Sequence, residues 1–542
     1  SSHFGSSREL ASFPRWLAVL QSWLLCCFAD LLRFYDDEAY IVSAFQGEAN
    51  FLWGSATAAA QIEGAWNISG KQASTWDDFC HSIPHRDTTD PDTFSKTCGS
   101  IPQGQSGSRW VTLDVTDDFF HTHNADIDLL SGEYGMNAMR MSMSWPRLMP
   151  LNKSSGKHEV NPEGVKFYKD VFAMMKKRGV TPFVTLHHWD VPNDLSWLED
   201  DIVNHFLDFA KLCFNEFPEI TNWATVNEPN SICSGGYGAG VFAPGHKSTT
   251  DHLVCGHHIL QAHARSVDYF RKSGKKGHIG IVLDYKWAYP NTDSEADNRA
   301  AAYDRDNLVG FWAEPIFKTG DYPQSLKDFF GAKMPVLTDE EKYMLKGSAD
   351  FWGLNTYGGH VAVWNDKKIE DYEPGDDVVG RYSFSPCSAG ADQTHVDDHE
   401  FECGAASGWL WAKPDSMRKY LNWVKDYYGV ENIFVTEFGV DVANESDMSM
   451  DEALVDTYRQ EYYKRYLKQI AVAKKEDGVA IRGVFAWSLM DNFEWADGLN
   501  FRFGITYVDF NDLSRHPKMS AKWWTKMIAR MKSEPPPRLF YY

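Results

Sequence analysis

Two glutamates stand at the ends of strand-like runs that are far apart in the sequence. Glu228 follows the apolar run at residues 223–226, and Glu437 follows the run at residues 433–436. A carboxylate at the C-terminal end of a buried β-run contributes little to packing and is well placed for chemistry. If a large α/β fold brings the two together, one can serve as acid/base and the other as nucleophile in glycoside hydrolysis.

The elements that must position these glutamates alternate along the chain from about residue 50 to 535. Eight β-like runs are expected at residues 51–54, 136–143, 180–187, 220–226, 278–283, 350–357, 432–436 and 482–487. Amphipathic helices are expected at residues 117–130, 162–177, 201–215, 252–272, 414–428, 451–474 and 520–531. Because eight parallel strands with right-handed crossovers close a barrel, the pattern predicts a single (β/α)8 TIM barrel of the α/β class.

Two long inserts follow the first and sixth β-runs, at residues 80–109 and 358–408. In a barrel such loops gather at the C-terminal face, where active sites lie. The second insert is rich in Asp and Glu. We interpret it first as a solvated surface loop and second as a rim that shapes the pocket.

The composition of the chain argues against some classes of binding partner. The formal net charge of −22 argues against nucleic acid and anionic membrane surfaces. The chain is 15% aromatic and contains 21 tryptophans. Most of these side chains must fill a large core, but Trp and Tyr also offer flat faces with a polar edge, which suit stacking on sugar rings.

Cysteines and glycosylation sequons favour the secretory pathway or the extracellular space. Asn-x-Ser sequons begin at Asn67, Asn152 and Asn444. No CxxC and no Cys/His zinc spacing occurs, so the cysteines are read as disulfide formers rather than metal ligands. Three pairs could close short loops: Cys80 with Cys98, Cys233 with Cys255, and Cys387 with Cys403.

Three regions are expected: an N-terminal extension at residues 1–49, the barrel at 50–535 and a tail at 536–542. Residues 16–28 resemble a signal-peptide core, yet apolar residues from Trp16 to Tyr35 recur every three or four positions, as on an amphipathic helix. Asp30 and Arg33 interrupt any membrane span. We expect a helix that packs on the body, on a partner protein or at a membrane surface. The oligomeric state is not predicted.

Seven short motifs follow the β-runs in order. They are QIEG at 61–64, MRMS at 139–142, HHWD at 187–190, NEP at 227–229, NTY at 355–357, TEFG at 436–439 and WSLMDNFEW at 487–495. In order and spacing the chain resembles glycoside hydrolase family 1, the β-glucosidase family, over roughly residues 51–531.

The resemblance implies a retaining hydrolase that works through a covalent glycosyl-enzyme intermediate. Glu228 matches the general acid/base and Glu437 the nucleophile. Arg140 matches the cation that keeps the nucleophile ionised, and Tyr357 matches the tyrosine that hydrogen-bonds it. Asn227 matches the asparagine that contacts the sugar 2-hydroxyl. No cofactor or metal is implied, because two carboxylates suffice for this chemistry.

The resemblance also implies a binding site for a small-molecule β-glycoside or oligosaccharide. Trp487 matches the platform beneath the sugar ring, and Trp409 resembles the tryptophan on the aglycone side. His187, by contrast, is interpreted as a structural histidine. The predicted substrate-binding residues are Gln61, His188, Trp189, Asn355, Trp409, Trp487, Glu494 and Trp495.

One departure and two alternatives qualify this expectation. Phe438 replaces the usual asparagine after the nucleophile, which puts the pocket shape and the aglycone side in question. Glu228 is not the Gln of plant thioglucosidases, and Glu494 would repel a sugar phosphate. The expected glycone is therefore an unphosphorylated hexose, with glucose ahead of galactose or fucose.

The alternatives are a transglycosylase on the same site and a non-catalytic domain that serves as a binding or assembly subunit.

Overall fold

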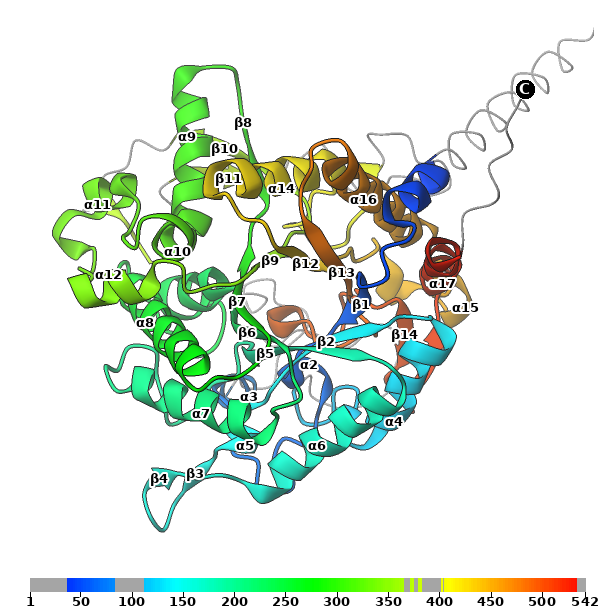
Figure 1. Ribbon diagram of the computed structural model, residues 1–542, viewed down its shortest axis with the longest axis horizontal. Coiled ribbons are helices and arrows are strands. Elements are labelled where there is room, and N and C mark those ends of the chain that lie inside the picture. Colours follow the sequence, from blue (N-terminus) through cyan, green and yellow to red (C-terminus); the bar gives the residue numbers. More distant parts are fainter. Residues whose placement is uncertain are drawn as a thin grey trace, which may run out of the picture.

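The computed structural model describes residues 37–82, 112–364, 371–374, 379–382, 401–402 and 404–533. Its centre is a closed, all-parallel barrel with the strand order β1-β13-β12-β9-β7-β6-β5-β2 (Figure 1). The strands are β1 (Leu52–Ala56), β2 (Ala138–Ser142), β5 (Thr181–His187), β6 (Asn222–Asn227), β7 (His278–Asp284), β9 (Trp352–Asn355), β12 (Ile433–Phe438) and β13 (Ile481–Trp487). The predicted (β/α)8 TIM barrel is confirmed, and each of the eight β-like runs contributes one strand.

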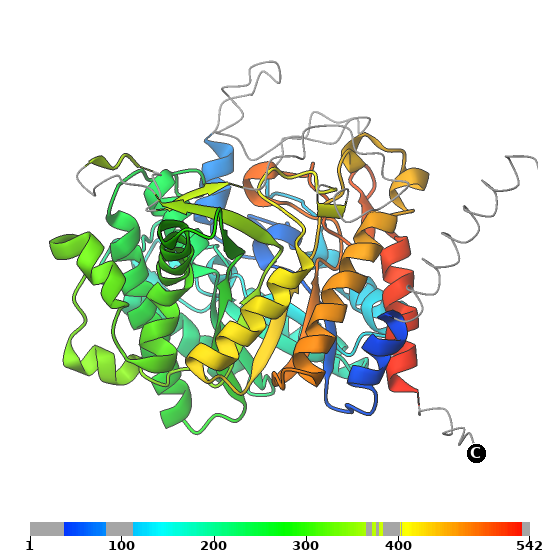
Figure 2. The same ribbon diagram turned by 90° about the horizontal axis from the view of Figure 1, so that it is seen from above.

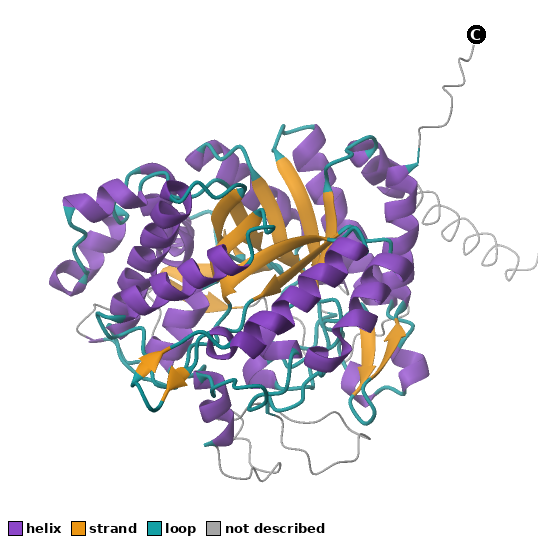
Figure 3. Ribbon diagram, turned by 60° about the horizontal axis from the view of Figure 1, so that its bottom comes forward, coloured by secondary structure: helices purple, strands orange, loops and turns teal. Residues whose placement is uncertain are grey.

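Helices form a layer around the barrel (Figure 3). The long ones are α4 (Phe119–Asp128), α6 (Pro162–Lys177), α7 (Ile202–Glu216), α8 (Asp251–Lys272), α14 (Pro414–Tyr428), α16 (Thr457–Lys475) and α17 (Met519–Lys532). A further long helix is α9 (Glu295–Arg305). The shorter ones are α2 (Ala59–Ile62), α3 (Thr75–His81), α5 (Trp145–Leu148), α10 (Phe311–Ala313), α11 (Gln324–Phe330), α12 (Asp339–Leu345) and α15 (Met450–Ala453).

The prediction of a single helix at residues 451–474 is wrong in one respect, because the segment forms two helices, α15 and α16. Between them Asp456 is drawn into a buried cluster, where its carboxylate accepts hydrogen bonds from Ser520 Oγ at 2.6 Å and pairs with Arg459 at 2.8 Å. These tertiary bonds outweigh the helical periodicity of the segment, which alone predicted one helix.

Several short elements lie at the C-terminal face of the barrel. The three-stranded sheet of β8 (Trp287–Pro290), β10 (Gly359–Trp364) and β11 (Val379–Tyr382) lies beyond the ends of β7 and β9 (Figure 2). The π-helical segments include η3 (Ser231–Ala239) and η4 (Asp306–Gly310). The remaining elements are η2 (Leu129–Glu133), η5 (Glu314–Lys318), η6 (Gly331–Lys333), η8 (Glu445–Asp447), η9 (Trp495–Asp497), β3 (Leu151–Asn152), β4 (Lys157–His158), β14 (Thr506–Asp509) and β15 (Ser514–Pro517).

A cluster of phenylalanines fills the interior of the barrel. Phe183 on β5 contacts Phe434 on β12 and Phe485 on β13, with ring centroids 5.2 and 5.4 Å apart. Phe351, just before β9, joins them at 5.3 Å from Phe183. Because β5 is not a neighbour of these strands in the sheet, the contacts must cross the barrel interior. The barrel is therefore packed with aromatic side chains, and the polar strand ends open only at the C-terminal face.

Residues 37–45 form a helix that packs on the barrel's outer layer. Ile41 and Phe45 are buried, and Glu38 accepts hydrogen bonds from Trp523 at 2.9 Å and Arg530 at 2.5 Å on α17. The amphipathic face expected from Trp16 to Tyr35 lies outside the described residues. Among the helices of the described residues, none combines the length and the apolar character needed to cross a bilayer.

One expected disulfide is present, between Cys233 on η3 and Cys255 on α8. Cys80 is also disulfide-bonded, but its expected partner Cys98 lies outside the described residues. The expected pair Cys387 and Cys403 lies outside them as well. Cys213 is a buried free thiol.

Candidate active site

The two glutamates share one mouth of the barrel through a bridging asparagine. Asn355, at the end of β9, donates to Glu228 Oε1 at 2.6 Å. Its carbonyl oxygen accepts from Thr436, the residue before Glu437, at 2.7 Å. Asn355 was expected to bind substrate. Because it also bonds Asn227 at 3.1 Å, its amide is used inside the protein, and it positions the catalytic groups.

Glu437 is held by two donors. The Arg140 guanidinium forms an ion pair with one carboxylate oxygen, and the Tyr357 hydroxyl donates to the other at 2.6 Å. Arg140 is fully buried and also donates to Asn227 Oδ1 at 2.5 Å. A buried carboxylate with a guanidinium and a phenol donor is stabilised in its charged form, as a nucleophile requires.

Glu228 has the opposite environment. Burial, reinforced by the negative charges of Asp284 and Glu437, raises the pKa of the Glu228 carboxyl well above its usual range. A carboxyl that keeps its proton near neutral pH can protonate a leaving oxygen. The backbone of Glu228 is also strained, with φ at 47°, a conformation that costs about 1–3 kcal/mol and gathers at functional sites.

Asp284 is a member of this site that sequence reasoning missed. It ends β7, and its Oδ2 accepts a 3.3 Å hydrogen bond from Ser231, three residues after Glu228. Its Oδ1 is buried and has no hydrogen-bond partner among the described residues. Burial raises the pKa of Asp284 to about 6, so it is charged at neutral pH. The signal available in the sequence was a carboxylate at the end of the fifth β-run.

Replacing Asp284 with Asn is expected to move the basic limb of the pH profile of kcat/KM to lower pH. Above pH 6 the Asp284 carboxylate opposes ionisation of Glu228, so its removal lowers the pKa of the Glu228 carboxyl. Asp284→Glu, which keeps the charge, is the matched control. A basic limb that stays in place in Asp284→Asn would show that Asp284 does not act on Glu228.

His188 and Gln61 present buried polar atoms for a neutral sugar. His188 Nε2 faces the Asn227 amide nitrogen at 3.0 Å, so Nδ1 carries the ring proton. Burial lowers the pKa of His188 well below its usual range and keeps it neutral. His188 Nδ1 and Gln61 Oε1 are buried without partners among the described residues. One donor and one acceptor are thus free to bond sugar hydroxyls.

Aromatic side chains wall this pocket. The Trp487 ring lies 6.1 Å from that of His188 in a stacked arrangement, and Trp189 stacks on Trp495 at 4.5 Å. The Trp189 indole donates to the Asn227 carbonyl at 3.2 Å, so Trp189 supports the wall rather than offering its N–H to a ligand. Burial, with the nearby Asp497 and Asp441 charges, raises the pKa of Glu494, which accepts a bond from Trp487.

Trp409 lies beside Tyr357, the tyrosine whose hydroxyl bonds Glu437. Its ring stands edge-to-face to Tyr357 at 5.6 Å and stacks on Phe503 at 6.1 Å. The ammonium group of Lys286 sits 4.9 Å from the Trp409 ring centroid. The residue expected on the aglycone side is therefore in contact with the catalytic machinery.

His187 and Phe438 both turn away from the pocket. His187 is buried among Trp145, Trp197 and Phe206, as its structural interpretation predicted. Phe438 packs between the barrel and the helices, edge-to-face against Tyr463 at 5.4 Å. Phe434 and Glu437 both face the barrel interior although they are three residues apart, because the register of β12 is irregular between Val435 and Phe438. Phe438 points outward. Phe438 therefore does not line the pocket, which answers the question of whether this residue changes the pocket's shape.

Replacing Phe438 with Asn is expected to reduce stability and to leave kcat/KM close to that of the unmodified protein. The substitution removes a fully buried ring and leaves a buried amide, which costs about 3–5 kcal/mol of unfolding free energy. Phe438→Leu, which keeps an apolar side chain, is the control and should lose less. Denaturant unfolding and aryl-glucoside kinetics measure the two effects, and a large loss of kcat/KM in folded protein would contradict the outward placement.

The described residues do not assemble a metal-binding group of three or more His, Cys, Asp or Glu side chains. The structure instead brings together Glu228, Glu437, Arg140, Tyr357 and Asn227 at the ends of β6, β12, β2 and β9. This arrangement has an acid with a raised pKa, a carboxylate ion-paired with Arg140, and neutral groups for hydroxyls. Its chemistry matches displacement at a sugar carbon with a protonated leaving group.

Comparisons with known proteins identify the family to which the chain is similar. The sequence model of glycosyl hydrolase family 1 matches residues 44–533. "Beta-glucosidase 1B" of Phanerodontia chrysosporium is 38% identical over 90% of this chain and 86% of its own. The crystal structure of the β-glucosidase from Trichoderma harzianum superposes with a TM-score of 0.78 and 34% identity, over 90% of this chain and 98% of that one. A rice β-glucosidase mutant in a covalent complex with Glc superposes with a TM-score of 0.77 and 32% identity, over 90% and 98% of the two chains.

Proposed function

This chain belongs to glycosyl hydrolase family 1 and is a β-glucosidase-like O-glycosyl hydrolase, and on that premise we propose that it cleaves terminal β-D-glucosides with retention of configuration. The observation that carries the proposal is the contrast between the two glutamates. Glu437 is ion-paired with Arg140, whereas burial and negative neighbours raise the pKa of Glu228. Two carboxyls held in opposite protonation states are what double displacement requires.

In the proposed reaction Glu437 attacks the anomeric carbon while Glu228 protonates the departing glycosidic oxygen. The resulting glucosyl ester on Glu437 is then attacked by water, which Glu228, now ionised, deprotonates. The Tyr357 hydroxyl and Arg140 hold the nucleophile in place in both steps. Asn227, fixed by Arg140 and Asn355, is placed to contact the 2-hydroxyl.

Glucose is the proposed glycone. The relatives named above are β-glucosidases, and one was captured in a covalent complex with Glc. The free polar atoms of Gln61 and His188 suit a neutral hexose, and the acidic Glu494 disfavours a phosphorylated one. Galactosides and fucosides are the competing glycones, and the ratio of kcat/KM values on the three aryl glycosides ranks them.

The configuration of the first sugar released tests retention. Proton NMR of the hydrolysis of an aryl β-glucoside is expected to show β-glucose before the α-anomer appears by mutarotation. Release of α-glucose first would rule out double displacement. Inert protein would instead favour a non-catalytic role, which the placement of Glu437 with Arg140 and Tyr357 does not support.

Phe438 gives no support to the transglycosylase alternative, because its ring lies outside the pocket. Passage through the secretory pathway is also proposed. It rests on the disulfide between Cys233 and Cys255 and on the exposed sequon asparagines Asn67 and Asn444. A mass shift of the native protein on treatment with an N-glycanase tests it, and unmodified sequons would argue against it.

A further inference from the structure

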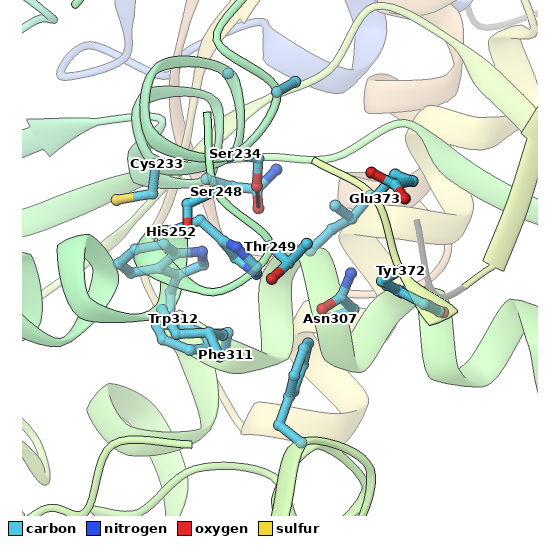
Figure 4. A pocket seen from close by; sticks show the side chains of 17 residues that line it. Cys233, Ser234, Ser248, Thr249, His252, Asn307, Phe311, Trp312, Tyr372 and Glu373 are labelled. Atoms are coloured by element: carbon cyan, nitrogen blue, oxygen red, sulfur yellow. Dashed lines mark hydrogen bonds between the residues drawn. The ribbon is translucent and has the colours of Figure 1, made fainter. Parts of the chain in front are cut away.

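A cavity of about 240 Å³ lies apart from the catalytic pocket (Figure 4). Its walls come from η3, the first residues of α8, the η4–α10 segment and the end of α11. None of the residues that line it belongs to a barrel strand, and none is among the catalytic or sugar-binding residues described above. A ligand in this cavity would therefore not compete directly for the groups around Glu437.

Uncharged polar groups face this cavity without partners. Asn307, Thr249 and His252 line it, and their side chains make no hydrogen bond within the described part of the chain. In Figure 4 these three side chains converge on the same space. Burial lowers the pKa of His252 to about 4, so the imidazole is neutral near pH 7. The cavity thus offers an amide, a hydroxyl and a neutral imidazole to a ligand.

Aromatic side chains supply the rest of the lining. Phe311 and Trp312 stand with ring centroids 4.8 Å apart, and Phe330 lies 6.0 Å from the ring of His252. Tyr372 and Leu253 complete this apolar side. Neutral hydrogen-bonding groups combined with aromatic faces match the hydroxyls and C–H faces of a sugar ring.

Other ligand classes fit the lining less well. Among the described residues that line the cavity there is no Lys or Arg to hold a phosphate or carboxylate, and Glu373 is the one carboxylate, too few for a hard cation. A purely apolar ligand would leave the Asn307 amide and the His252 imidazole buried and unpaired. The volume lies below the about 300–1,000 Å³ of typical drug-sized ligand sites, which suits one ring rather than a chain.

We propose that this cavity is a second sugar site, which binds one neutral hexose unit separately from the active site. It bears on catalysis through η3, which begins three residues after Glu228. Ser231 at the start of η3 bonds Asp284, and the Cys233–Cys255 disulfide ties η3 to α8. Occupation of the cavity therefore acts on the segment that carries the acid/base.

The test counts glucose molecules bound per full-length chain at equilibrium, with aryl-glucoside turnover measured in parallel. Thr249→Trp fills the cavity from a partly exposed position, and Val336→Trp adds the same bulk at a site that is 81% exposed and outside the cavity. The unmodified protein and Val336→Trp are expected to bind two glucose molecules, and Thr249→Trp one, with an unchanged KM. One glucose in all three proteins, or two in Thr249→Trp, would overturn the proposal.

A second variant keeps the test decisive if Thr249→Trp does not fold. Asn307→Leu preserves the size of the side chain and removes the carbonyl and NH2 groups of its amide. It is expected to weaken the second binding event roughly tenfold. Unchanged affinity, or a cavity that binds benzyl alcohol but no glucose, would overturn the sugar assignment. Loss of turnover in every protein would count against the proposed hydrolase function and leave the glucose count valid.

A longer sugar distinguishes whether the cavity binds free sugar or one unit of a bound substrate chain. If the cavity takes a unit of a bound substrate chain, cellotetraose will bind more tightly than glucose, and Thr249→Trp will remove the difference. If it takes free sugar, the two probes will bind the cavity with similar affinity. Both results support a sugar site and assign its role.

Discussion

Replacing Glu437 with Ala is expected to reduce kcat on every β-glycoside by about 10⁶-fold, the scale of loss when a hydrolase loses its nucleophile. Alanine cannot form the glycosyl ester, and Arg140 is left as a buried cation without its main partner. Initial rates on p-nitrophenyl β-glucoside, β-galactoside and β-fucoside measure the effect. The loss should be similar for all three, because the ester forms with each sugar.

Glu431→Ala is the matched control for this variant. Glu431 is exposed and precedes the same strand, so its removal should leave the rates unchanged. Because loss of the Arg140 ion pair also affects folding, the unfolding transition of Glu437→Ala must be measured beside its activity. Folded Glu437→Ala with near-normal turnover would contradict the assignment of the nucleophile.

Replacing Glu228 with Gln is expected to give a loss that depends on the leaving group. Proton transfer by a positioned acid contributes roughly 10²–10⁴-fold, so a poor leaving group such as methanol should show the full loss in the first step. A dinitrophenyl leaving group needs little protonation. With it the first step should stay fast, and the second step, which lacks its base, should limit the rate.

Rapid-mixing kinetics on the two substrate types measure this contrast. With dinitrophenyl glucoside, Glu228→Gln should give a burst of phenolate followed by slow turnover, and the basic limb of the pH profile should disappear. An equal loss on both substrates would show that Glu228 does not act as the acid. The leaving-group series serves as its own control, since protein and glycone stay constant.

The barrel could be predicted from the sequence, and the two candidate glutamates could be located in it, because these signals are local. Apolar β-like runs between segments of helical period marked the eight strands, and Glu228 and Glu437 stood out as carboxylates at strand ends. The neighbourhood of Cys233 and Cys255 in the sequence also indicated their disulfide, which the structure contains. Each of these inferences needed only residues within one run or one short loop.

Other features depended on contacts between distant segments. Asp284 also ends a β-run, but its effect on Glu228 depends on β7 lying beside β6 in the barrel. Asn355 is occupied by bonds to Glu228 and Thr436, which only the closed barrel brings together. The outward side of Phe438 could not be predicted from strand alternation either, because the register of β12 is irregular between Val435 and Phe438.

Backbone strain at the site could not be predicted either. Trp189 and Trp495 adopt positive φ angles of 75° and 45°, beside the 47° of Glu228. Side chains of this kind rarely adopt that conformation, and sequence patterns give no sign of it. The surrounding packing imposes it, including the stack of Trp189 on Trp495.

Trapping the covalent intermediate tests the central claim most directly. A 2-deoxy-2-fluoro-glucoside with a dinitrophenyl leaving group should load the enzyme quickly and release the sugar slowly, because fluorine at C2 destabilises the cation-like transition states of both steps. Peptide mass spectrometry should then find one fluoroglucosyl group on the peptide that contains Glu437. Steady turnover without a label, or a label on another residue, would contradict the proposed mechanism.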